Sequence, residues 1–213
     1  MSIKFHILSS SKDLALYATE IERVAESTTD SVKKLLAVKD VDVVFYDNPV
    51  ATMDEVGGIG GFTPNQHTIF ISLNPQHPNF ENAIKNELSF ILAHEFHHTL
   101  RWQKTVDGDT LLEALIFEGL AEHFAIESTG RQKASPWAQA LTDTEKKKFL
   151  ERASKEWLVP TYNNALWFFG SNPKEIPCWT GYTLGFDLVA KYLQTHTETS
   201  ASKLVFADAT LFI

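Results

Sequence analysis

His94-Glu95-Phe96-His97-His98 is the stretch around which the rest of this chain can be interpreted. His94 and His98 are four residues apart, so on a helix of about 3.6 residues per turn their side chains leave the same face. Two imidazoles placed in this way can bind one metal ion. Glu95 lies about 100° further round, where a carboxylate can accept the proton of a metal-activated water. The spacing therefore predicts a zinc site with His94 and His98 as ligands and Glu95 as general base.

The helix that carries this stretch is expected to be buried. It is predicted to begin at Asn79 or Asn82 and to end near Trp102. Its apolar residues spread round nearly the whole circumference, which is typical of a helix inside a protein. His97 faces away from His94, so we interpret it as a packing residue or as a contact behind a ligand. The alternative for the whole stretch is a histidine-rich turn of an ordinary core helix.

A second helix, predicted over residues 111–127, is expected to supply a third ligand, because catalytic zinc usually has three protein ligands and an open fourth position. Glu118 and Glu122 both lie in the middle of its apolar stripe, where a carboxylate is costly unless it is paired or binds a metal. We predict Glu118 as the third ligand and Glu122 as the acceptor of the other ring N–H of a ligand histidine. The alternative is that both are solvated at the edge of the stripe. The opposite face, expected to meet water, carries Glu113, His123 and Glu127.

Composition limits the class of protein. The chain has 213 residues, 44% of them hydrophobic, which suits one domain with a sizeable core or a small domain with a helical extension. Its formal net charge of −8 argues against nucleic acid and anionic membranes as partners, and the oligomeric state is left open. Cys178 is the only cysteine, so no intrachain disulfide is possible, and we expect it to pack as a small apolar residue. With no basic leader and no apolar run near about 18 residues, a cytoplasmic location is expected.

The residues before the motif predict a small sheet and one long helix. Residues 3–8 suggest an edge strand, and residues 41–46 and 67–73 are rich in the β-branched and aromatic types that favour strands. A helix is predicted to begin at Ser11 or Asp13 and to present one apolar face. That face consists of Leu14, Tyr17, Ile21, Val24, Thr28, Val32 and Leu35.

A glycine-rich stretch, residues 57–62, precedes the strand at 67–73. It is not a dinucleotide fingerprint, because no helix begins directly after it. It is either a flexible loop or a bulged strand, or it is the place where backbone approaches an extended substrate. On the last interpretation Gly60, Gly61 and Phe62 bind substrate, and a peptide adds to the sheet edge as an extra strand through main-chain hydrogen bonds.

The expected fold class is α+β in a single domain. Residues 1–130 are predicted to form a small twisted sheet packed on the zinc-binding helices, which a turn at 107–109 joins. Residues 131–213 are predicted to be a mostly helical C-terminal part, in which Gly181 and Gly185 allow close packing of another element. Its expected helices are at 136–140, 142–157 and 179–195.

The two motifs together resemble the gluzincin pattern of thermolysin-like zinc proteases. In that pattern a glutamate follows the second histidine by about twenty positions, and here Glu118 follows His98 by twenty. The pattern usually has Asp four residues further on, where this chain has Glu122. Over residues 41–192 the chain resembles the YjaZ-like family of predicted bacterial zinc proteases. The stretches that carry this likeness are 60–64, 111–115, 118–124, 136–138 and 181–185.

This resemblance implies a compact gluzincin core, with the active-site helix beneath a small twisted sheet and the glutamate helix beside it. We expect one zinc ion per chain and a peptidase that acts on a peptide or protein substrate. The developing oxyanion needs one more donor, for which Tyr182 is the first choice and Tyr162 the second, although each is equally a candidate for packing. The alternative is a catalytically silent zinc-binding regulatory protein on a degenerate protease scaffold.

Overall fold

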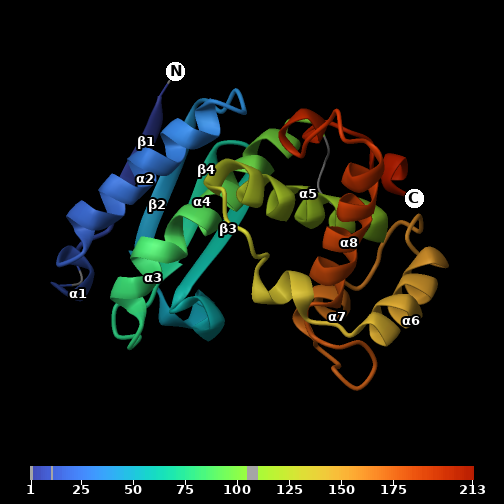
Figure 1. Ribbon diagram of the computed structural model, residues 1–213. Helices are drawn as coiled ribbons and strands as arrows, with labels where there is room; N and C mark the ends of the chain where they lie inside the picture. Colours follow the sequence, from blue (N-terminus) through green and yellow to red (C-terminus); the bar gives the residue numbers. More distant parts are fainter. Residues whose placement is uncertain (1, 11, 105–109) are drawn as a thin grey trace. The chain divides into compact units, whose positions relative to one another are not determined.

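The computed structural model describes residues 2–10, 12–104 and 110–213, and it is an α+β structure (Figure 1). A four-stranded mixed sheet forms in the N-terminal part, and the rest of the chain is mostly helical. The predicted fold class is confirmed at this level. The predicted turn at 107–109 and the predicted helix start at Ser11 lie outside the described residues.

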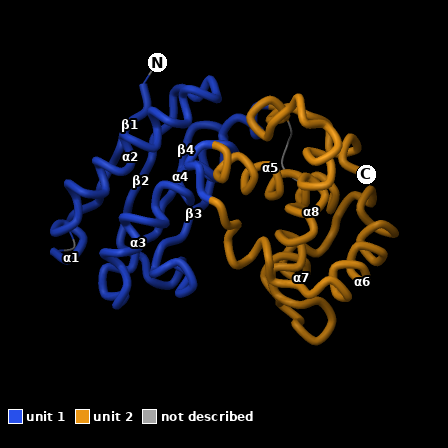
Figure 2. The backbone as a smooth tube through the Cα atoms, viewed as in Figure 1, with its two compact units in different colours: residues 1–103, 128–131 blue, residues 104–127, 132–213 orange. Residues whose placement is uncertain are grey.

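The chain separates into two compact units, coloured in Figure 2. The first contains residues 1–103 and 128–131, and the second contains residues 104–127 and 132–213. The sheet belongs to the first unit.

The sheet has the strand order β1-β2-β4-β3. Its strands are β1 (Ile3–Ile7), β2 (Val41–Asp47), β3 (Ile59–Asn65) and β4 (Thr68–Leu73). The first three strands in the order are parallel, and β3 pairs with β4 as an antiparallel hairpin. β1 is therefore an edge strand, as predicted, and β3 is the other edge. The register of β3 shifts between Phe62 and Asn65, so the glycine-rich stretch leads into an irregular strand.

Burial alternates along the central strands, which is typical of a sheet that is covered on one face. Helices α2 and α4 pack against the sheet and against each other (Figure 1). The side chains buried on the sheet are Val41, Val43, Phe45, Ile69, Ile71 and Leu73.

The helices of the first unit are α1 (Lys12–Ala15), α2 (Ala18–Lys33), α3 (Phe80–Asn86) and α4 (Leu88–Arg101). The prediction of one long helix before β2 was wrong, because the helix is interrupted before Ala18. There the ring of Tyr17 packs edge-to-face on Phe80, with centroids 5.0 Å apart. The predicted helix before residue 102 is also divided, at Glu87, whose carboxylate accepts a hydrogen bond of 2.6 Å from Arg131.

The second unit is built on α5 (Leu111–Thr129), of which all but the last two residues belong to it. Its other helices are α6 (Asp143–Ser154), α7 (Asn164–Phe169) and α8 (Thr180–Thr195). Its 3-10 turns are η3 (Pro136–Gln139), η4 (Ser202–Leu204) and η5 (Ala209–Phe212). The first unit has two more, η1 (Pro49–Ala51) and η2 (Asp54–Val56).

Glycines permit close contact between α5 and α8. A Cβ atom on Gly119 would collide with the Gly185 carbonyl, and one on Gly185 would collide with the Leu115 carbonyl. Gly181 lies against the ring of Phe168, so the predicted close packing at Gly181 and Gly185 is confirmed. Cys178, in contrast, is exposed in the turn before α8. The prediction that it packs as a small apolar residue was therefore wrong.

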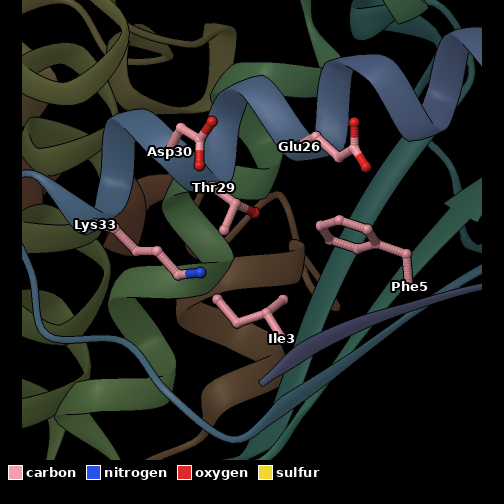
Figure 3. Close-up of a pocket in the computed structure, with 6 residues that line it drawn as sticks. All are labelled: Ile3, Phe5, Glu26, Thr29, Asp30 and Lys33. Atoms are coloured by element: carbon pink, nitrogen blue, oxygen red, sulfur yellow. The ribbon is translucent and has the colours of Figure 1, made fainter. Parts of the chain in front are cut away.

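One pocket of about 290 Å³ lies between β1 and α2 (Figure 3). It is lined by Ile3, Phe5, Glu26, Thr29, Asp30 and Lys33, none of which was predicted as a site residue. In the part of the chain that the structure describes, every helix is too short or too polar to cross a membrane.

Candidate metal centre

The His-Glu-x-x-His stretch lies on α4, and the helix is buried as predicted. The exposed fraction is 7% for His94, 4% for His98 and 6% for Glu95 between them. The two imidazole rings lie side by side on one face, with centroids 4.7 Å apart and planes at 84°. His97 is fully buried, with its ring 6.5 Å from that of His98.

One group of three potential metal ligands is found among the described residues, and it consists of His94, His98 and Glu118. Each side chain offers one ligand atom, and these atoms lie within 4.8 Å of one another. α4 carries the two histidines, and α5 carries the glutamate, which is partly buried. The three predicted ligands are thus the members of this possible metal site.

The donor set fits zinc. Imidazole nitrogen and carboxylate oxygen are both ordinary zinc ligands, and three protein ligands leave a fourth tetrahedral position for water or substrate. Atoms bound to zinc at about 2.0–2.2 Å lie about 3.3–3.6 Å apart in tetrahedral geometry. Ligand atoms within 4.8 Å of one another are compatible with that geometry, so these residues form a possible zinc site.

Glu95 is held by the neighbouring strand β3. The Thr63 hydroxyl lies 2.6 Å from Glu95 Oε2 and 3.2 Å from the Glu95 carbonyl oxygen. A Cβ atom on Gly61 would lie only 2.5 Å from Glu95 Oε1, so a side chain at that position would displace the carboxylate. The contacts of both positions with the Glu95 carboxylate place residues 61 and 63 on the same face of the strand. This face of β3 therefore forms one wall around the predicted general base.

Thr63 was not predicted as a site residue. The sequence placed it two residues after Gly61, which puts both on one face of any strand through this stretch. That alternation was the available signal, but it does not say which helix the face meets. The contact with Glu95 joins residues 32 positions apart and is a tertiary feature.

The other residues predicted to bind substrate are placed differently. A Cβ atom on Gly60 would collide with the Ala51 carbonyl, so its missing side chain is explained by packing against η1. Phe62 is 63% exposed and lies opposite Phe70 of β4, on the face of β3 that is turned away from Glu95. Of the three, Gly61 is the one that lies against the Glu95 carboxylate.

Glu122 is buried to 2% exposure and is bound by the segment that follows α5. Its Oε1 accepts a hydrogen bond of 2.6 Å from the Ser135 backbone N–H, and its Oε2 accepts one of 3.2 Å from the Trp137 indole. A carboxylate with two such donors is stabilised in its ionised form. The predicted contact of Glu122 with a ligand histidine stays a prediction.

The face of α5 expected to meet water is not a solvated face. Glu113, His123 and Glu127 are all only partly exposed, and most of the helix is buried. His123 stacks on Phe186 with centroids 4.2 Å apart, and its Nε2–H donates to the Phe186 carbonyl at 3.0 Å. Burial lowers the pKa of His123, although the bond to Phe186 and the charges of Glu122 and Asp187 oppose the shift. The amphipathic prediction failed because both sides of this helix are packed.

The two tyrosines considered for the oxyanion belong to an aromatic cluster of the second unit. Tyr182, on α8, makes edge-on ring contacts with Phe168 and Phe169, at 5.1 and 6.5 Å between centroids. Tyr162 contacts Phe168, and its hydroxyl accepts a hydrogen bond of 3.0 Å from Asn164. Their predicted catalytic role stays a prediction.

A buried His-Glu-x-x-His helix with a glutamate close to both histidines is typical of zinc metalloproteases. Residues 21–213 match the family described as "Predicted Zn-dependent protease (DUF2268)", and the chain belongs to this family. The family inferred from the two motifs is thus confirmed.

Two curated relatives come from Bacillus subtilis (strain 168), and both carry the name of an uncharacterized protein. YjaZ is 30% identical over 135 residues, which cover 58% of this chain and 51% of the relative. YjfC is 26% identical over 163 residues, which cover 70% of this chain and 50% of the relative. The chain therefore spans about half the length of the curated relatives it matches. No solved structure shows a significant match.

Proposed function

We propose that this protein is a zinc-dependent peptidase that hydrolyses peptide bonds, with His94, His98 and Glu118 as zinc ligands. The observation that carries the proposal is the approach of these three ligand atoms to within 4.8 Å of one another. Membership of a family of predicted Zn-dependent proteases supports the same conclusion. The number of ligands supports a catalytic site, because three protein ligands leave a position open.

Bound zinc lowers the pKa of a coordinated water to about 7 and polarises a carbonyl oxygen. Glu95 acts beside it as general base: its carboxylate accepts the proton of the attacking water and later gives that proton to the leaving amine. Such proton transfers are worth typically about 10²–10⁴-fold in rate. Glu122 supports the site by accepting a ring N–H of a ligand histidine, and Tyr182 donates to the oxyanion.

The outer edge of β3 is the proposed binding place for the peptide. The Ile59 carbonyl accepts from Met53 on this edge, and the Thr63 carbonyl accepts from the Trp102 indole at 2.8 Å. Backbone groups in an antiparallel strand alternate between the two edges, so the N–H and C=O of Gly61 point to the same outer edge. A substrate strand would pair with Gly61 between these two contacts, beside the Glu95 carboxylate.

The first test measures metal binding by the full chain. Purified protein should contain about one zinc per chain, and Glu118→Gln should weaken zinc binding by more than about 100-fold, beyond the loss typical of supporting contacts. Glu113→Gln is the matched control, because it removes another partly buried glutamate of α5. Equal zinc affinity in the two variants would contradict the assignment of Glu118.

The second test measures cleavage with a broad peptide library. The zinc-loaded chain should cut peptide bonds, a chelator should stop the reaction, and added zinc should restore it. A chain that binds zinc through these residues but cuts nothing would support the alternative, a silent zinc-binding regulatory protein. A chain without zinc affinity would contradict both.

A further inference from the structure

The Thr63 hydroxyl faces two oxygens of one residue. It lies 2.6 Å from Glu95 Oε2 and 3.2 Å from the Glu95 carbonyl oxygen, and it has only one hydrogen to donate. A separation of 2.6 Å lies at the short end of the range for O–H···O hydrogen bonds, so the hydroxyl donates to Oε2 rather than to the more distant carbonyl oxygen. Thr63 is 5% exposed, so water has little access to this contact.

We infer that Thr63 is a positioning residue that holds the Glu95 carboxylate in place. The inference rests on the proposed function. The hydroxyl donates to Oε2, so Oε1 is the oxygen that takes the proton of the attacking water in the proposed reaction.

The position of Thr63 is itself fixed by β3. Its carbonyl accepts from the Trp102 indole at 2.8 Å, and its strand pairs with β4. Gly61 lies on the same face and leaves room for Oε1. The hydroxyl thus acts from a rigid support, and such support is what keeps a catalytic group within a fraction of an ångström of its working position.

The test compares Thr63→Val with Thr63→Ser in the zinc-loaded full chain. Valine keeps the shape and loses the hydroxyl, so kcat should fall about 10- to 100-fold, the range for a lost hydrogen bond to a charged group. KM and zinc content should change less than about twofold, and serine should restore kcat to within about threefold of the original. Loss of kcat in both variants, or in neither, would overturn the inference.

Thr28→Val is the matched control. Thr28 is also a buried threonine of the first unit, and its hydroxyl donates to the Val24 carbonyl at 2.7 Å. This variant should lower the urea midpoint while kcat stays unchanged. A fall in kcat equal to that of Thr63→Val would mean that general destabilisation explains both results.

A second readout needs no catalysis and uses the metal-free chain. Thr63→Val should shift the urea midpoint more in the parent than in a Glu95→Leu background, where the acceptor is already gone. Equal shifts would show that the contact does not exist and would overturn the inference even in an active enzyme. The shifts can differ while the zinc-loaded chain cuts no peptide. In that case the contact between Thr63 and Glu95 is supported, but the peptidase proposal fails, and with it the positioning role of Thr63 in catalysis.

Discussion

Two carboxylates, Glu95 and Glu122, are buried in different units and are held in different ways. Glu95, on α4, is 6% exposed and receives one hydrogen bond, from the Thr63 hydroxyl. Glu122, on α5, is 2% exposed and accepts hydrogen bonds from the Ser135 backbone N–H and from the Trp137 indole N–H. A hydroxyl can donate or accept, whereas these two N–H groups can only donate.

The difference bears on what each carboxylate can do. The partner of the Glu95 carboxylate is a hydroxyl, which can turn round and accept as well as donate. Protonation of Glu122 would set a carboxylic acid against two fixed donors, so this residue is suited to remain ionised. The comparison favours proton transfer at Glu95 and a structural contact at Glu122, and each prediction below tests one side of it.

The largest effect is expected at Glu95. Glu95→Gln keeps the size of the side chain but removes the base, so turnover should fall by about 10²–10⁴-fold while zinc content stays at the level of the parent. Peptide cleavage and metal analysis on the same preparation give both numbers. Full activity in this variant would falsify the assignment of Glu95 as general base.

Glu122→Ala should act on stability first. Removing the carboxylate leaves two donors without their acceptor, and hydrogen bonds to charged groups contribute about 1.5–3 kcal/mol each. We expect a loss of about 2–4 kcal/mol in the free energy of unfolding, measured with urea. Glu122→Gln should lose less, because its amide oxygen still accepts one bond.

The same pair of variants tests the supporting role at the metal. If Glu122 also orients a ligand histidine, Glu122→Gln should weaken zinc binding by about 10- to 100-fold. Unchanged zinc affinity in a folded Glu122→Gln chain would restrict this residue to holding the segment that contains Ser135 and Trp137.

Gly61→Ala should have a smaller effect, and on the rate alone. Its Cβ atom would lie 2.5 Å from Oε1 and 2.8 Å from Cδ of Glu95, so the carboxylate must move. Displacement of a catalytic group by about 1 Å can cost up to about 100-fold in rate, and we expect a fall in kcat of about tenfold. Gly60→Ala is the control, because its Cβ would meet the Ala51 carbonyl and should reduce stability instead. Equal rates for Gly61→Ala and the parent would contradict the close fit.

The sequence predicted those parts of the site that depend on local geometry. His94 and His98 share a face on any helix, and Glu118 stood out as a charge within an apolar stripe. The Thr63 contact was missed because it depends on which strand lies against α4. The breaks at Tyr17 and Glu87 were missed for a related reason, since each residue is bound to a distant partner, Phe80 in one case and Arg131 in the other.

The α5 helix shows a further limit of sequence patterns. Its apolar residues gave a stripe that placed Glu118 and Glu122 on a packed side, yet the same reasoning predicted that His123 and Glu127 face water. The Glu127 carboxylate instead accepts hydrogen bonds from the Ser202 hydroxyl and backbone, at 2.7 and 2.9 Å. Polar residues on the second side of a helix can be satisfied by another element, which periodicity alone does not report.

The smallest effect is expected from His123, the neighbour of Glu122 in the sequence. It tests how burial acts on a neutral ring, whereas Glu122 is a buried charge. Because burial lowers its pKa, the folded chain favours the neutral ring, while the unfolded chain titrates near the ordinary value of about 6.5. Below that pH the unfolded state binds a proton that the folded state does not, so stability should fall as pH decreases from about 6.5 toward the lower folded pKa.

His123→Gln keeps an N–H for the Phe186 carbonyl but cannot titrate, so its urea midpoint should change less between pH 8 and pH 5 than that of the parent. Other carboxylates with a lowered pKa, such as Glu81 and Glu145, titrate below this window and affect both chains equally. Parallel pH profiles for the two chains would show that His123 does not distinguish the folded state in this range.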